Sequence, residues 1–345
     1  MKAVVMTGFG PAHETLKFDE QHPAPVRKKG EVLVQVHASS VNPAEFRIRQ
    51  GLMPKWMIRV PQILGVDIAG VVLEADEGSK FKPGDRVFGC TDQFMKDPWG
   101  TYAELCSARE RLLAPIPPGV GFEEAACLGI AGMTAWQALA PSMPLEGKRV
   151  FVQGGAGGIG HFTVQIAKAQ GACVATTCSA RNADFVTQDL GADLAVDYTL
   201  VKDAFTLAPG EQPYDVVVDL VGAEPRSWGL LRRGGRMAAV SFDALMESRK
   251  AQGNSVLTAI VWRILKLSAA SALGLLPGPG RAVYDAVQQS HEPDKGLVQL
   301  GDLVAAGKVK VHITQVVPLE GIADAHAECE KGHTRGKVAI RVRPE

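Results

Sequence analysis

A glycine-rich segment at residues 154–160 constrains the fold of this chain more than any other feature. It follows the apolar run Arg149-Val-Phe-Val-Gln, which predicts a strand, and precedes apolar-periodic residues over 159–169, which predict a helix. The spacing GxGxxG occurs at Gly155, Gly157 and Gly160. Glycine permits a tight turn and lets a pyrophosphate approach the main chain, where a helix N-terminus favours the anion. This context predicts dinucleotide binding rather than a flexible linker.

The residues around this turn alternate between helical and strand patterns, which is typical of a doubly wound parallel sheet. Helices are predicted over 122–139 and 183–190, and strands over 173–177, 194–196, 214–220 and 236–240. We therefore predict a Rossmann domain over residues 122–282.

The two ends of the chain show different secondary-structure patterns from the middle. Residues 1–121 contain short β-type runs separated by Gly and Pro, which predicts an antiparallel, barrel-like domain. From about residue 281 we predict a polar helix, followed by a helix at 297–306, a strand at 310–315, a helix at 321–330 and a strand at 337–342. Residues 283–345 are expected to return to the first domain, so the chain is predicted to be an α/β protein with one discontinuous domain.

The residues after the strand at 173–177 indicate which dinucleotide binds. An acidic residue there would accept the ribose hydroxyls of NAD, but the sequence continues Cys178-Ser-Ala-Arg-Asn. Ser179 supplies a hydroxyl and Arg181 a guanidinium suited to a 2′-phosphate, although Arg181 on a solvated helix start is the alternative. The pattern favours NADPH over NADH.

Composition excludes several other classes of function. The 37 Lys and Arg residues balance 37 Asp and Glu residues, so no net charge draws the chain to nucleic acid, and a small-molecule partner is expected. Six cysteines without a CxxC pair, and no signal-peptide pattern, predict a reducing, cytoplasmic location. The apolar stretch Val256–Leu276 contains Arg263 and Lys266, so we expect it to cover a dimer contact, an active-site mouth or a membrane surface rather than to span a bilayer.

Several runs of residues match one known family over nearly the whole chain. They are Val41-Asn-Pro-Ala-Glu-Phe-Arg-Ile-Arg-Gln-Gly, Leu64-Gly-Val-Asp-Ile-Ala-Gly-Val-Val, Gly84-Asp-Arg-Val-Phe-Gly, Gly100-Thr-Tyr-Ala-Glu, Ala131-Gly-Met-Thr-Ala-Trp, Leu190-Gly-Ala-Asp and Gly332-His-Thr-Arg-Gly-Lys, besides the glycine-rich turn. Together they resemble the zinc-independent quinone oxidoreductase branch of the medium-chain dehydrogenases and reductases. Within that branch the chain is similar to the mitochondrial reticulon-interacting oxidoreductases.

The resemblance implies a GroES-like catalytic domain, a Rossmann domain and NADPH, in a homodimer. It places Asn42 and Thr134 near the nicotinamide as candidate catalytic residues. It assigns the dinucleotide to the glycine-rich turn and to the 2′-phosphate residues: Gly155, Ala156, Gly157, Gly158, Ile159, Gly160, Ser179, Arg181 and Tyr198. The zinc-binding Cys and His of relatives align near Asn42 and Val66, so no metal is expected.

The implied reaction is hydride transfer from NADPH to a quinone or to an activated C=C bond. The motifs do not separate this from an enoyl-thioester reductase, and a non-catalytic NADPH-binding scaffold is the alternative of another class. The proton donor stays open between bound water and three side chains, Tyr102, His161 and His333, each of which also has a packing explanation. For Glu45, a structural role in a turn is favoured over a catalytic one.

Overall fold

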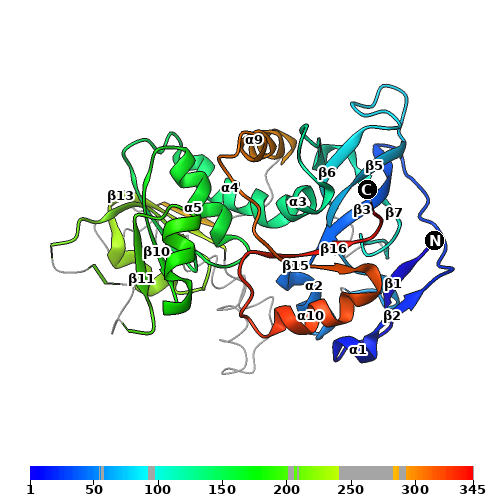
Figure 1. Cartoon of the computed structure of the whole chain (residues 1–345), viewed down its shortest axis with the longest axis horizontal. Coiled ribbons are helices and arrows are strands. Elements are labelled where there is room, and N and C mark those ends of the chain that lie inside the picture. Colours follow the sequence, from blue (N-terminus) through cyan, green and yellow to red (C-terminus); the bar gives the residue numbers. More distant parts are fainter. Residues whose placement is uncertain are drawn as a thin grey trace. The chain divides into compact units, whose positions relative to one another are not determined.

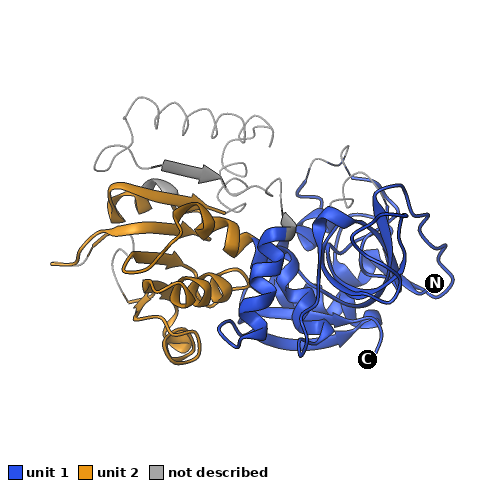
Figure 2. Cartoon of the chain, turned by 90° about the horizontal axis from the view of Figure 1, so that it is seen from above, with its two compact units in different colours: residues 1–133, 290–345 blue, residues 134–289 orange. Residues whose placement is uncertain are grey.

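A computed structural model describes residues 1–53, 55, 58–91, 98–200, 206–207, 210–240, 283–286 and 293–344. The chain divides into two compact units, residues 1–133 with 290–345, and residues 134–289, coloured blue and orange in Figure 2. The apolar stretch at 256–276, expected to cover a dimer contact, an active-site mouth or a membrane surface, lies outside the described residues. Within the described ranges, no helix is long and apolar enough to cross a membrane.

Unit 1 is built on a seven-stranded sheet around the long strand β3 (Glu31–Ser40). The order is β15 (Ile313–Pro318), β16 (Lys337–Arg341), β3, β5 (Asp67–Glu74), β6 (Arg86–Cys90) and β8 (Leu113–Pro115), and β7 (Leu105–Arg109) also pairs with β3. All pairs are antiparallel except β15 with β16. Val32, Val34 and Val36 alternate along β3 into one core, as expected for a strand with one buried face.

A smaller sheet and several helices complete unit 1. The smaller sheet has the order β2 (Leu16–Asp19), β1 (Ala3–Met6), β4 (Gln62–Ile63). The helices are α1 (Ala12–Thr15), α2 (Pro43–Arg49), α3 (Phe122–Cys127), α9 (Pro293–Ala305) and α10 (Ile322–Glu330), shown in Figure 1. Because β16 pairs antiparallel with β3, with Ala339 opposite Ser40, the last strand lies beside residues from the start of the chain.

Unit 2 contains a six-stranded parallel sheet, which confirms the predicted doubly wound fold. Its order is β11 (Leu194–Asp197), β10 (Cys173–Cys178), β9 (Arg149–Gln153), β12 (Tyr214–Asp219), β13 (Leu231–Ala239) and β14 (Val283–Ala286). This is the 3-2-1-4-5-6 order of dinucleotide-binding sheets, in which ligands lie at the carboxyl ends of the strands near the switch between β9 and β12. The helices are α4 (Met133–Leu139), α5 (Gly160–Ala169) and α6 (Glu224–Ser227).

The structure differs from the sequence expectations in four places. Residues 283–286 form a strand rather than the predicted polar helix, because they add to the parallel sheet beside β13. Residues 122–133 pack with unit 1, where α3 lies against β3, instead of starting the second domain. The predicted strand at 310–315 starts later, at Ile313. The predicted helix at 183–190 contains a π-helical turn over Phe185–Asp189.

Candidate cofactor and active sites

Three glycines of the turn at 154–160 are required by its own packing. Gly154 has φ +78°, a conformation that favours glycine, and its N–H donates to Thr177 Oγ1 at 2.8 Å. A Cβ at Gly155 would clash with the Thr176 hydroxyl, and a Cβ at Gly160 would clash with the Gly154 carbonyl. These contacts hold the turn tightly against the end of β10.

Neither packing within the turn nor backbone conformation requires a glycine at position 157. A Cβ there would meet only the Gly154 carbonyl oxygen, at an ordinary 3.4 Å, and φ is not positive. Gly157, Gly158 and Ile159 are partly exposed and directly precede the ten-residue helix α5. The space that a Cβ would fill is therefore available for the backbone approach of a pyrophosphate at a helix N-terminus.

The candidate 2′-phosphate residues lie at the same edge of the sheet. Ser179 follows β10 and Tyr198 follows the adjacent β11, and the Tyr198 N–H donates to the Cys178 carbonyl at 3.1 Å. Arg181 is exposed in the short 3₁₀ turn that Ser179 begins, and Tyr198 is 57% exposed. The acid at this edge, Asp197, turns one oxygen to the N–H (2.9 Å) and hydroxyl (2.7 Å) of Thr199.

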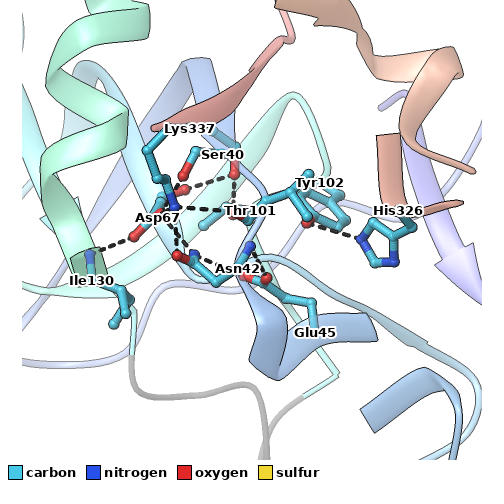
Figure 3. A network of polar contacts seen from close by, with 11 residues as sticks. Ser40, Asn42, Glu45, Asp67, Thr101, Tyr102, Ile130, His326 and Lys337 are labelled. Carbon is cyan, nitrogen blue, oxygen red and sulfur yellow. Dashed lines mark hydrogen bonds and ion pairs between the residues drawn. The ribbon is translucent and has the colours of Figure 1, made fainter. Parts of the chain in front are cut away.

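In unit 1, a buried polar network surrounds Asn42, the N-cap residue of α2 (Figure 3). The Asn42 Nδ2 group donates to Asp67 Oδ2 at 2.7 Å and to Glu45 Oε1 at 3.2 Å. Lys337 Nζ donates to Asn42 Oδ1 at 2.5 Å and lies 3.5 Å from Asp67 Oδ2. The other Asp67 oxygen accepts from the Ile130 N–H at 2.6 Å, and the Ser40 hydroxyl also donates to Asp67. The network unites residues from both ends of the chain.

Glu45 is a buried acid in this network. Its carboxylate accepts the backbone N–H of Asn42, as in a capping box, so the predicted structural role at a turn is what the geometry shows. Burial first, and the nearby charge of Asp67 second, raise the pKa of Glu45 to about 8, against the opposing effect of Lys337. Glu45 is therefore mostly protonated at neutral pH.

Of the three candidate proton donors, Tyr102 and His161 are buried in internal contacts and His333 is exposed. The Tyr102 hydroxyl is buried 3.1 Å from His326 Nε2, and burial raises the pKa of Tyr102 well above its usual value. His161 is buried in α5, 3.1 Å from the Gly157 carbonyl, and His333 is exposed on the turn after α10. A partner of Tyr102 that the sequence did not single out is His326, which burial and Arg49 keep neutral by lowering its pKa to about 3.

The remaining predicted catalytic residue, Thr134, starts unit 2 in helix α4, whereas Asn42 lies in unit 1. In the sequence, Lys337 and Asp67 stand out only as members of two family-like runs, at residues 332–337 and 64–72. A lysine and an aspartate 270 positions apart give no local signal of pairing.

Asn42, one of the two positions that align with zinc ligands, accepts a hydrogen bond from an ammonium group. Lys337 Nζ donates to the oxygens of Asn42 and of Val41, the latter at 3.0 Å, and approaches Asp67. The oxygens that a metal would need are thus already bound to an ammonium group. Across the part of the chain that the structure describes, no three His, Cys, Asp or Glu side chains converge as metal ligands.

Comparison with known families assigns both parts of the chain. Residues 28–118 match the alcohol dehydrogenase GroES-like domain, and residues 190–340 match the family described as zinc-binding dehydrogenase. Both matches agree with the expected fold of a GroES-like and a Rossmann-type domain.

Individual relatives align over almost the full length. A chloroplastic quinone oxidoreductase homolog of Spinacia oleracea is 31% identical and covers 99% of this chain and 98% of its own length. A chloroplastic NADPH-dependent alkenal/one oxidoreductase of Arabidopsis thaliana is 30% identical (99% and 79%), and a mitochondrial NAD(P)H oxidoreductase of Danio rerio is 28% identical (99% and 91%). The solved quinone oxidoreductase from Coxiella burnetii superposes with a TM-score of 0.80 at 30% identity, covering 99% of both chains.

Proposed function

Because the chain belongs to the medium-chain dehydrogenase/reductase superfamily, among the quinone oxidoreductases, we propose that it is a zinc-independent enzyme that uses NADPH to reduce a quinone or an activated C=C bond. The observation that carries this proposal is the free space beside Gly157. The packing of the turn does not require a glycine there, whereas a bound pyrophosphate would. Relatives with quinone and alkenal/one names support the acceptor class.

Each side chain in the proposed site has a physical task. We propose that the turn at 155–160 binds the pyrophosphate and that Ser179, Arg181 and Tyr198, which follow β10 and β11, bind the 2′-phosphate. NADPH, when bound, supplies a hydride from its nicotinamide. Asn42 and Thr134 are proposed to lie near that ring. Since Tyr102 and His161 are buried in internal contacts, the proposed source of the proton is water or the exposed His333.

The test of this function is NADPH oxidation by the purified chain with a panel of quinones, enones and enoyl thioesters, with NADH as control. Turnover of quinones or enones with NADPH supports the proposal. Turnover confined to enoyl thioesters would assign the alternative reductase class. NADPH binding without turnover of any acceptor would identify a binding scaffold instead.

The Arg181→Ala variant is expected to weaken NADPH binding about tenfold, about 1.4 kcal/mol, and to leave NADH binding nearly unchanged. A guanidinium and a phosphate form charge-assisted hydrogen bonds, and the exposure of Arg181 limits their strength through solvent screening. Dissociation constants of both cofactors for both proteins measure the effect. Equal losses for the two cofactors would show that Arg181 is only a solvated charge.

Purified protein is expected to contain far less than one equivalent of zinc and to keep its activity in the presence of a chelator. The reason is the Lys337 ammonium among the oxygens of Asn42, Val41 and Asp67, since a dication there would meet an existing positive charge. Elemental analysis and assays with and without chelator check this. A stoichiometric metal whose removal abolishes turnover would refute it.

The assembly and location of the protein stay predictions. A homodimer follows from the family resemblance, and a cytoplasmic location from the cysteine pattern. Light scattering of the purified chain and fractionation of the source cells test them separately.

A further inference from the structure

We propose that the buried ion pair of Lys337 and Asp67 is a positioning device that fixes the orientation of the Asn42 side-chain amide. The amide lies between the two charged groups, with Oδ1 facing the ammonium and Nδ2 facing the carboxylate (Figure 3). This arrangement aligns the amide dipole with the field of the ion pair. The functional consequence rests on the proposed function, which places Asn42 at the nicotinamide.

The hydrogen-bond pattern permits one orientation of the amide. Both Nδ2 hydrogens are used, one on Asp67 at 2.7 Å and one on Glu45 at 3.2 Å, while Oδ1 accepts from Lys337 at 2.5 Å. Rotation of the amide by 180° would turn Oδ1 toward the Asp67 carboxylate and Nδ2 toward the Lys337 ammonium, so both contacts with charged groups would become unfavourable. Asn42 is only 4% exposed, so water has little access to replace these partners.

The two charged residues are themselves held on rigid elements. Lys337 starts β16 and also donates to the Val41 carbonyl at 3.0 Å, while the Val41 N–H donates to the Val338 carbonyl at 3.0 Å. Asp67 starts β5, and its second oxygen accepts the Ile130 N–H at 2.6 Å. The ion pair is therefore placed by backbone contacts from three separate parts of unit 1.

The locked orientation decides what Asn42 offers to a ligand. A carboxamide has two donor hydrogens and two acceptor sites, and the network uses both donors and one acceptor. What remains is one lone pair on Oδ1. Asn42 can thus accept an N–H group, such as that of a nicotinamide carboxamide, but has no hydrogen left to donate to an oxyanion. Asn42 would select the orientation of the ring, and Lys337 with Asp67 would select the orientation of Asn42.

The test separates positioning from simple charge balance with a neutral double variant. Lys337→Met alone leaves Asp67 buried without its cation and is expected to lower the melting temperature by roughly 10 °C. Lys337→Met with Asp67→Asn removes both charges, and most of that loss is expected to return. If the ion pair only stabilises the fold, kcat of the double variant is expected to recover together with its melting temperature. Under the positioning proposal, kcat of NADPH-dependent reduction stays at least about tenfold below wild type, as in Asn42→Ala.

A second readout does not need enzyme activity. The chain has three asparagines, Asn42, Asn182 and Asn254, so labelling asparagine with ¹⁵N gives three pairs of side-chain amide resonances, and Asn42→Ala identifies the relevant pair. Wild type is expected to show two exchange-protected Asn42 protons at distinct shifts. In the double variant these are expected to shift and lose protection.

Unchanged Asn42 resonances in the double variant, or full recovery of kcat, would overturn the positioning proposal. If wild type turns over no acceptor, the proposed function fails, and the resonances still decide how the amide is held. Shifted resonances together with recovered stability and depressed kcat support the proposal.

Discussion

The Gly157→Asp variant is expected to bind NADPH at least about a hundredfold more weakly than wild type, a loss of about 2.7 kcal/mol or more, while keeping its fold. The fold is expected to survive because a Cβ at position 157 meets only the Gly154 carbonyl oxygen, at 3.4 Å. Binding is expected to fail because the new side chain and its negative charge would occupy the approach of the pyrophosphate. Fluorescence titration with NADPH, with circular dichroism as a check on folding, measures both effects.

A matched control comes from the same turn. Gly160→Ala adds only a methyl group, yet that methyl would clash with the Gly154 carbonyl and is expected to destabilise unit 2. The two variants therefore separate a glycine needed by the ligand from a glycine needed by the fold. Normal NADPH affinity in folded Gly157→Asp protein would rule out this turn as the pyrophosphate site.

The parts of the fold that could be predicted from sequence depend on local patterns. The strand β9, the turn and helix α5 are adjacent in the chain, and their apolar periodicity and glycine spacing predict them directly. The sequence predicts a helix where the structure has strand β14. These four residues form a strand because they pair with β13, and local patterns do not reveal such a non-local contact. Helix α3 joined unit 1 for the same kind of reason, since its apolar face is buried against β3.

The candidate site also contains residues that the sequence could assign and contacts that it could not predict. The family resemblance assigned Ser179 and Tyr198 to one site, and in the structure each follows a strand of the parallel pair β10 and β11, whose carboxyl ends lie at one edge. The surroundings of Asn42 could not be predicted, since Lys337 is 295 residues away and reaches it only because β16 pairs with β3. The sequence motif contained the lysine, but only the pairing of distant strands explains its contact with Asn42.

The Glu45→Gln variant is expected to remove a pH dependence of stability that wild type has between about pH 5 and about pH 8. Burial, and secondly Asp67, raise the pKa of Glu45 from 4.5 to about 8 in the folded state. In this range the folded protein keeps a proton that the unfolded chain releases. The contribution of Glu45 to the free energy of unfolding is full below its pKa in the unfolded chain and falls as the pH rises toward its pKa in the folded protein. The change is up to about 1.4 kcal/mol per pH unit.

Glutamine keeps the shape of Glu45 and accepts the same N–H of Asn42, but it does not titrate. The free energy of unfolding of wild type minus that of the variant is therefore expected to decrease steadily across this range, measured by denaturant titration at several pH values. The matched control is Glu124→Gln. The carboxylate of Glu124 also accepts a backbone N–H at a helix start, that of Gly121 before α3 at 3.3 Å, but Glu124 is partly exposed. A pH dependence shared by both variants would trace the effect to helix capping. Parallel curves for wild type and Glu45→Gln would mean that Lys337 outweighs burial and keeps Glu45 ionised, so the network around Asn42 would carry a net negative charge.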